Sequence, residues 1–197
     1  MDKRRREFET GRTCARAALG RLGRPSAPLL PGRHGEPRWP EGIVGSITHT
    51  RGYRGVGVSE AAHAAAIGID AEPNQPVPGP LLHWVATPDE RAEVDALLRA
   101  SPGVRFDRLL LCAKEAVFKS WFTLTTRRLG FEDVAIELEP APGSGTFTAR
   151  LEDAHDRRAR LRGRWLLAEG LLITAVVIAV EPSPPSAERL SSRALRH

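Results

Sequence analysis

The sequence predicts an α+β protein, which a short internal repeat would divide into two similar halves. Helix-like and strand-like segments follow one another in the order helix, strands, helices, strands. A segment with four prolines, 73–80, separates the first strands from the later helices, and a motif in the first helix recurs in a later one. With 197 residues, of which 41% are hydrophobic, the chain can form the core of one domain or of two small ones.

The first half is expected to contain one helix and three short strands. Apolar side chains recur at helical spacing in 3–23, and Gly23 is a suitable end for that helix. The segment 25–42 is rich in proline and glycine, which predicts an irregular loop. Small residues in the strands allow a backbone or a ligand to approach closely. The three strands are expected at 43–49, 55–59 and 64–72.

The second half is expected to follow a semi-rigid linker at 73–80, because proline suits neither a helix interior nor a central strand. Thr87-Pro88-Asp89-Glu90 is a good start for a helix at 87–99. A longer helix is expected at 104–122. The apolar, β-branched segment 171–180 favours a central strand. Strands are predicted at 131–139, 146–152 and 160–180, with turns at 140–145 and near Gly170.

The recurring motif supports the division into halves. Residues 14–19 and 112–117 both open with Cys-Ala and a basic residue, and each lies on a helix that precedes several strands. Chance is the alternative for so short a match. If the repeat is real, a ligand site belongs in the cleft between the halves. The predicted units are then a first half, a proline linker, a second half and a disordered tail, at 1–72, 73–80, 81–181 and 182–197.

The charge of the chain favours a polyanionic partner. The net charge is +5 and the isoelectric point is about 10.0, which suits a nucleic acid, a nucleotide or an acidic protein. The alternative is an arginine-rich surface without such a partner. No apolar run is long enough to span a membrane, and no apolar region follows the charged N-terminus as in a secretory signal. Cys14 and Cys112 form no disulfide framework, so we expect a cytoplasmic location.

Three carboxylates and a lysine are the candidates for chemistry. Asp70 and Glu72 face the same side of a predicted strand and could share Mg²⁺ or Mn²⁺; the alternative is two exposed acids at a strand end. Glu115 and Lys119 share a helix face, where the alternative is an ordinary surface ion pair. Their helix is otherwise apolar, however, which favours a functional placement. Glu115 would complete a metal site and Lys119 would neutralise a phosphate, as phosphoryl-type transfer requires.

Other residues have more than one interpretation. His49 ends a strand of small residues and is a phosphate donor, a base or a core residue. Arg4 and Arg12 can bind phosphates through bidentate hydrogen bonds, or they lie on a solvated helix face. The sequence contains neither a phosphate-binding loop of known type nor cysteine and histidine pairs with zinc spacing. Cys112 lies on an apolar helix, which is expected to raise its thiol pKa rather than to activate it.

Taken together, 45–49, 67–72 and 112–119 resemble the three motifs of the Sfp-like and EntD-like 4′-phosphopantetheinyl transferases. Residues 4–16 and 35–40 are similar to the actinobacterial branch of that family. The resemblance covers 3–180, nearly the whole chain. It implies a pseudo-twofold fold with coenzyme A bound in the cleft between the halves, and a first half that is truncated relative to the family.

The resemblance also implies an activity: Mg²⁺-dependent transfer of the 4′-phosphopantetheine group of coenzyme A to a serine of an apo acyl or peptidyl carrier protein. Asp70, Glu72 and Glu115 would hold the ion. Glu115 would deprotonate the serine, directly or through water, and Lys119 would stabilise the departing adenosine 3′,5′-bisphosphate. The further contacts to coenzyme A would come from Arg4, Arg12, Arg33, His34, Ser46 and His49.

The resemblance implies a monomer that acts on carrier proteins and binds neither nucleic acid nor membranes. Residues 84–99, together with the rest of the second half, are the acceptor surface that the family geometry leads us to expect. Two alternative functions remain at this point. One is a homologue that binds coenzyme A without transfer; the other is a basic nucleic-acid-binding module, which would have no use for the three carboxylates.

Overall fold

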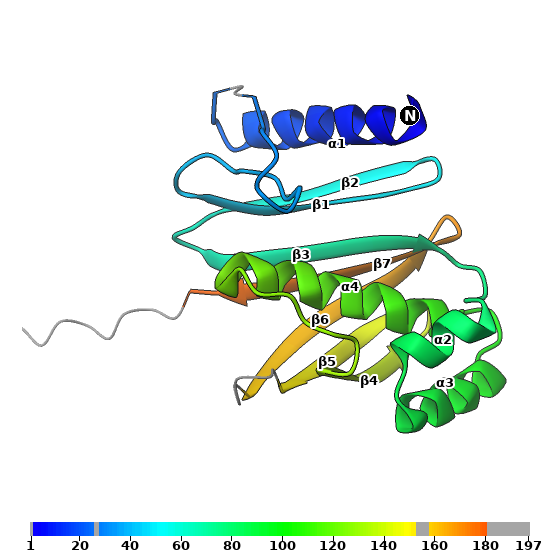
Figure 1. Cartoon of the computed structure of the whole chain (residues 1–197). Helices are drawn as coiled ribbons and strands as arrows, with labels where there is room; N and C mark the ends of the chain where they lie inside the picture. Colours follow the sequence, from blue (N-terminus) through cyan, green and yellow to red (C-terminus); the bar gives the residue numbers. More distant parts are fainter. Residues whose placement is uncertain (1, 26–27, 153–157, 181–197) are drawn as a thin grey trace, which may run out of the picture.

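The computed structural model describes residues 2–25, 28–152 and 158–180 (Figure 1). The side chains of residues 2–6 and 158 lie outside this description, as does the predicted disordered tail. The described elements confirm the α+β class. The helices are α1 (Asp2–Arg21), α2 (Gly79–Val85), α3 (Pro88–Ala100) and α4 (Phe106–Thr125). The strands are β1 (Ile43–Thr50), β2 (Tyr53–Glu60), β3 (Ala64–Pro73), β4 (Val134–Ala141), β5 (Ser144–Glu152), β6 (Arg158–Ala168) and β7 (Leu171–Ala179).

A five-stranded antiparallel sheet forms the larger layer, in the order β3-β7-β6-β5-β4. The β-branched segment at 171–179 is therefore an interior strand, as predicted. Helix α4 crosses one face of this sheet (Figure 1). Its apolar side chains form the main core with those of the sheet, because burying both faces removes a large apolar area from water. Members of this core include Leu109, Leu110, Val117, Phe147, Leu151, Trp165, Leu172 and Val176.

The small residues of β3 allow α4 to lie directly against that strand. A Cβ atom on Gly68 would overlap the backbone carbonyl oxygen of Ala116, far inside van der Waals contact. The sequence predicts close backbone approach at this strand, and the structure confirms it. The consequence is that residues of α4 and the carboxylates at the end of β3 lie side by side.

A smaller layer is formed by the antiparallel pair β1–β2 with α1 packed on it (Figure 1). Ala15 and Leu19 of α1 are fully buried and pack with Leu29 and Ile43 in a second core. This layer joins the larger sheet through side chains: Ser46 Oγ accepts a hydrogen bond from Ile69 N at 3.1 Å.

Thr48 makes the second bond of this joint, since its Oγ1 accepts from Ala71 N at 3.0 Å. Strand β3 is an edge strand, and its outward N–H groups require partners when they are buried. The hydroxyls of β1 therefore satisfy the edge of β3 in place of a backbone ladder. The division into two halves and their twofold relation stay predictions.

The proline segment departs from expectation at both ends. The sequence predicts a linker throughout 73–80, but Pro73 is the last residue of β3, and Gly79 and Pro80 form the first turn of α2. Proline is accommodated there because the first N–H groups of a helix have no intrahelical partner. The remaining linker is anchored to the start of α4, where Asp107 Oδ2 accepts from Val77 N at 2.8 Å and Asn74 Oδ1 accepts from Arg105 N at 2.8 Å.

The predicted start of α3 is confirmed as a reciprocal cap. Thr87 Oγ1 accepts from Glu90 N at 3.2 Å, and Glu90 Oε2 accepts from Thr87 N at 2.8 Å. Within the described residues, no helix is both long and apolar enough to cross a membrane.

Candidate active site

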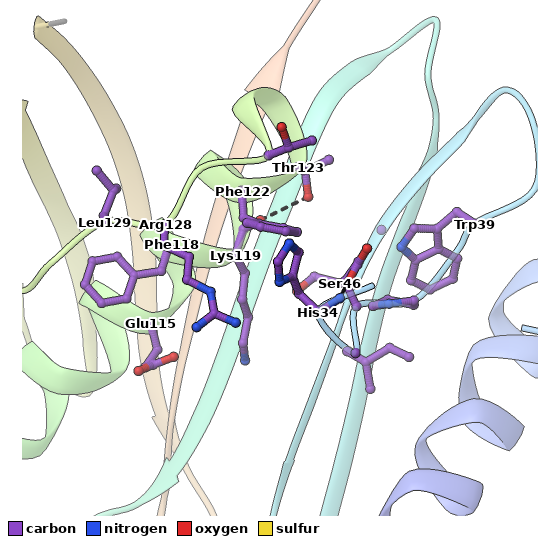
Figure 2. A pocket seen from close by; sticks show the side chains of 16 residues that line it. His34, Trp39, Ser46, Glu115, Phe118, Lys119, Phe122, Thr123, Arg128 and Leu129 are labelled. Atoms are coloured by element: carbon purple, nitrogen blue, oxygen red, sulfur yellow. Dashed lines mark hydrogen bonds between the residues drawn. The ribbon is translucent and has the colours of Figure 1, made fainter. Parts of the chain in front are cut away.

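A pocket of about 660 Å³ opens between the smaller layer and α4. Figure 2 shows Glu115, Phe118 and Lys119 of α4 on one side, and His34 and Ser46 on the other. The remaining wall is mostly apolar. It includes Trp39, Ile47, Phe122 and Leu129, with Arg128 as a further basic side chain.

Asp70 lies at the joint of β1, β3 and α4. Its Oδ1 accepts hydrogen bonds from Thr48 Oγ1 at 3.0 Å and from Lys119 Nζ at 2.8 Å. Its Oδ2 is buried and has no hydrogen-bond partner in the described part of the chain. A buried carboxylate oxygen without a partner is costly, so this atom is suited to coordinate a cation or to accept a hydrogen bond from a ligand.

The other two predicted ligands share the negative field of Asp70. Burial raises the pKa of Glu72, and the charge of Asp70 raises it further, while Arg108 opposes both effects through an ion pair of 3.2 Å. Burial also raises the pKa of Glu115, followed by the charge of Asp70. The anionic forms of both carboxylates are therefore less stable at this site than they would be in water.

The chemistry of these donors suits a metal ion better than their present spacing does. As they stand, no three His, Cys, Asp or Glu side chains of the described residues lie close enough to enclose an ion. The donors are nevertheless all carboxylate oxygens, Asp70 Oδ2 lacks a partner among the described residues, and the acids repel one another. Such a set fits a hard divalent cation. Its ligation by Asp70, Glu72 and Glu115 stays a prediction.

Lys119 reaches from α4 to β3. Besides the bond to Asp70, its Nζ donates to Ile69 O at 2.9 Å. An ammonium group has three donors, and the structure engages two of them in these bonds. Since Lys119 also lines the pocket, the group can serve a ligand there.

The residues predicted to bind coenzyme A are placed unequally. His34 and Ser46 line the pocket, and the His34 ring packs edge-on against Phe122 with centroids 5.6 Å apart. His49 is exposed on β1, opposite Arg54 of β2, and does not line the pocket. Arg33 is exposed in the loop and is likewise absent from the lining residues.

Arg12 is buried between α1 and the loop that borders the pocket. Its Nη2 is 3.5 Å from Gly35 O, its guanidinium lies over the Phe8 ring, and its Nη1 has no hydrogen-bond partner in the described residues. Burial lowers the pKa of Arg12, and Glu36 opposes this effect. The side chain of Arg4 lies outside the described residues.

The sequence analysis did not identify three polar residues of this region as part of the site: Thr48, Arg108 and Lys114. Lys114 is fully buried, and its Nζ donates to Val85 O, Glu90 Oε2 and Phe131 O at 2.8, 2.9 and 3.0 Å. Burial lowers its pKa, while Glu90 opposes the shift. Lys114 therefore holds other segments to α4 beside Glu115. For Lys114, the signal in the sequence was its place within the mostly apolar stretch 109–118.

Cys112 behaves as predicted. It is fully buried, and burial raises the pKa of its thiol well above the ordinary value. A protonated, buried thiol is a poor nucleophile, so Cys112 belongs to the core.

Comparison with known proteins identifies the family. Residues 1–59 match the 4′-phosphopantetheinyl transferase N-terminal domain, and residues 66–175 match the 4′-phosphopantetheinyl transferase superfamily. The chain is 51% identical to the 4′-phosphopantetheinyl transferase Svp of Streptomyces mobaraensis over 184 residues, which is 91% of this chain and 74% of that protein.

Two further relatives are 4′-phosphopantetheinyl transferases as well. PptT of Mycobacterium tuberculosis is 45% identical over 183 residues, covering 89% of this chain and 80% of the relative. Npt of Nocardia iowensis is 42% identical over 190 residues, covering 91% and 84%. On these matches, the chain belongs to the 4′-phosphopantetheinyl transferase superfamily and is an enzyme of that type.

Proposed function

We propose that this enzyme transfers the 4′-phosphopantetheine group from coenzyme A to a serine hydroxyl of an apo acyl or peptidyl carrier protein. The second product is adenosine 3′,5′-bisphosphate, and the reaction depends on Mg²⁺ or Mn²⁺. The observation that carries the proposal is the cluster of Asp70, Glu72, Glu115 and Lys119 beside a pocket of about 660 Å³. Family membership supports carrier-protein modification in general.

The pocket suits coenzyme A in size and in character. Ligand sites for cofactors are typically clefts of about 300–1,000 Å³ with mostly apolar walls and a few polar groups. The apolar wall around Trp39 and Phe122 can pack against the uncharged parts of the ligand. Polar and basic side chains from both sides, His34, Ser46, Lys119 and Arg128, can donate to phosphate oxygens.

Further basic residues are proposed as phosphate contacts at the border of the pocket. Arg12 has a buried Nη1 donor without a partner in the described residues, which supports an anionic ligand beside it. Arg4, Arg33 and His49 belong to this proposed set by resemblance alone. The side chains of Arg33 and His49 do not line the pocket, so they would meet the ligand beyond its walls.

The carboxylates are proposed to hold the divalent cation. Asp70, Glu72 and Glu115 would be its protein ligands, and Asp70 Oδ2 is the oxygen still available for it. When bound, the cation supplies positive charge next to the diphosphate of coenzyme A. The raised pKa values of Glu72 and Glu115 support this assignment, because they indicate a site with too little positive charge.

Glu115 is proposed as the general base. It lies half-buried on the pocket wall, and its raised pKa brings it closer to the working range of a base near neutral pH. The carboxylate takes the proton of the carrier serine, and the serine oxygen bonds to the β-phosphorus of coenzyme A. The bond from that phosphorus to the oxygen bridging the two phosphates breaks. Lys119 then neutralises the charge on the departing bisphosphate.

The carrier protein is proposed to dock on 84–99. Trp84 is 82% exposed on α2, which is unusual for so large an apolar side chain and typical of a contact surface. The net charge of +5 favours an acidic partner. We further propose that the enzyme acts as a monomer. A cytoplasmic location is also proposed, and the free thiols of Cys14 and Cys112 agree with it.

Incubation with coenzyme A, Mg²⁺ and an apo carrier protein tests the proposal by intact-mass spectrometry. The expected result is a gain of one phosphopantetheine group on the carrier, which EDTA prevents. A carrier that a known transferase modifies, but that this enzyme leaves unchanged at high enzyme concentration, would contradict it. Binding of coenzyme A measured by calorimetry then separates an inactive binder from a protein of another function.

A further inference from the structure

Thr48 connects the two layers of the molecule at the carboxylate cluster. Its side chain is 2% exposed, and its single hydroxyl makes two hydrogen bonds. Oγ1 accepts from Ala71 N at 3.0 Å, which fixes β1 to the edge of β3. The same Oγ1 donates to Asp70 Oδ1 at 3.0 Å. Acceptance from the amide directs the hydroxyl proton toward the carboxylate, because the backbone donor occupies one lone pair.

The hydrogen bond from Thr48 to Asp70 determines which oxygen of that carboxylate remains available for a cation. Lys119 Nζ also donates to Oδ1, at 2.8 Å, so both protein donors use the same oxygen. Oδ2 is left buried without a hydrogen-bond partner among the described residues. A β-branched threonine has little freedom about χ1, so its hydroxyl is held in place more firmly than that of a serine. The arrangement therefore keeps the carboxylate of Asp70 in one orientation.

We propose that Thr48 is a positioning residue for Asp70, whose hydroxyl orients the carboxylate so that Oδ2 receives the divalent cation. This inference rests on the proposed function, in which Asp70 is a cation ligand. Groups that hydrogen-bond to ligating carboxylates fix their orientation, and their loss typically weakens metal affinity about 10- to 100-fold. Thr48 itself neither touches the reacting atoms nor carries charge.

Ser46 provides a matched control within the same strand. It precedes Thr48 by two residues, it is also buried, and its Oγ accepts from Ile69 N at 3.1 Å. Both hydroxyls therefore satisfy the edge of β3, but the hydrogen bond to Asp70 is made by Thr48. Loss of Ser46 Oγ tests the joint between the layers, and loss of Thr48 Oγ1 tests the joint together with the orientation of Asp70.

The test is Mn²⁺ binding, measured from the free-ion signal in electron paramagnetic resonance. The full chain is titrated without coenzyme A and without a carrier protein, so that neither transfer nor a contact between Ser46 and coenzyme A contributes to the measured affinity. Thr48→Val is expected to raise the Mn²⁺ dissociation constant at least about tenfold. Thr48→Ser, which retains the hydroxyl, and Ser46→Ala are each expected to stay within about threefold of the unmodified enzyme.

Stability is recorded with the same samples, because valine leaves Ala71 N without its acceptor. If Thr48→Val does not fold, Thr48→Ala removes the same hydroxyl and leaves space for water at the amide. Equal Mn²⁺ affinity in the folded hydroxyl-free variant and in the unmodified enzyme would overturn the inference. So would an equal loss of affinity in Ser46→Ala, since the effect would then belong to the joint alone.

Asp70→Asn separates this inference from the proposed function. If this variant binds Mn²⁺ as tightly as the unmodified enzyme, Asp70 is no ligand, and the metal assignment fails together with the role of Thr48. If Asp70→Asn weakens binding but removal of the Thr48 hydroxyl does not, the metal site stands and only the positioning role is wrong.

Discussion

Lys119 Nζ lies 2.8 Å from Asp70 Oδ1 and joins the middle of α4 to the end of β3. The residue proposed to stabilise the leaving group is thus bonded to a residue proposed to hold the cation. Without a bound cation, the ammonium supplies positive charge to a cluster whose other acids have raised pKa values. Lys119 and a divalent cation therefore compete for the negative charge of Asp70.

This competition predicts opposite effects of Lys119→Met on binding and on turnover. Removal of the ammonium leaves Asp70 without that positive neighbour, while Thr48 still holds Oδ1 in place, so Mn²⁺ binding in the presence of coenzyme A is expected to tighten several-fold. The kcat for transfer is expected to fall about 10²- to 10³-fold, because a cation on the leaving side is lost. Spin-resonance titration measures the first effect and single-turnover mass spectrometry the second. Weaker Mn²⁺ binding with unchanged kcat would contradict the competition.

The buried pair of Lys114 and Glu90 predicts a large loss of stability when one partner is removed. The Lys114 side chain is completely buried and that of Glu90 is 5% exposed, at an N···O distance of 2.9 Å. Glu90 also accepts from Ile136 N at 2.8 Å. Lys114→Met is expected to lower the free energy of unfolding by about 3–5 kcal/mol, because Glu90 then remains buried without its cation. Urea denaturation provides the measurement.

An exposed ion pair serves as the control for that prediction. Arg150 and Glu137 pair at 3.3 Å with side chains 60% and 47% exposed. Arg150→Ala is expected to change the free energy of unfolding by less than about 1 kcal/mol. If both variants cost the same, the Lys114 pair is no more than a surface interaction.

Gly68 is predicted to tolerate no side chain. A Cβ atom there would overlap Ala116 O and lie 2.8 Å from Ser120 N, both backbone atoms of α4. Gly68→Ala must push α4 away from β3, at a cost of about 1–3 kcal/mol or more. Gly20→Ala in α1 is the matched control, since a Cβ atom at that position would meet nothing within 4 Å and alanine favours a helix. Thermal unfolding should show a clear loss for the first variant and none for the second.

Trp84 offers a test of the carrier-docking surface. Because its side chain is 82% exposed, Trp84→Ala should leave the unfolding temperature nearly unchanged. The kcat/KM for the carrier protein is expected to fall about tenfold, or about 1.4 kcal/mol, while the KM for coenzyme A is retained. Transfer kinetics at varied carrier concentration measure this effect. Unchanged kcat/KM would place the docking surface elsewhere.

Local patterns account for most of the fold that could be predicted correctly. The start of α3 and the interior position of β7 were both predicted correctly. Each has a signal in neighbouring residues of the chain, a capping sequence for α3 and an apolar, β-branched segment for β7. Helix α2 was missed because its first turn contains Gly79 and Pro80, which locally favour a turn. The rest of α2 is recognisable as an amphipathic helix only from the structure, in which Val85 is buried.

The candidate site was predictable in its charges but not in its connections. The sequence singled out Asp70, Glu115 and Lys119 by their types and spacing. It carried no signal that Thr48 reaches Asp70, because that contact depends on how β1 approaches the edge of β3. Tertiary placement also decides that His49 is exposed beside Arg54 rather than on the pocket wall.

The most direct test of the proposed chemistry compares the unmodified enzyme with Glu115→Gln in one experiment. Glutamine keeps the shape of the side chain but removes its basicity and its charge. Intact-mass spectrometry follows an apo carrier protein with coenzyme A and Mg²⁺, while calorimetry measures binding of coenzyme A without the carrier. We expect transfer by the unmodified enzyme that EDTA abolishes, and a rate at least about 10²-fold lower for Glu115→Gln with coenzyme A still bound. Transfer by Glu115→Gln at the unmodified rate would contradict the roles assigned to Glu115.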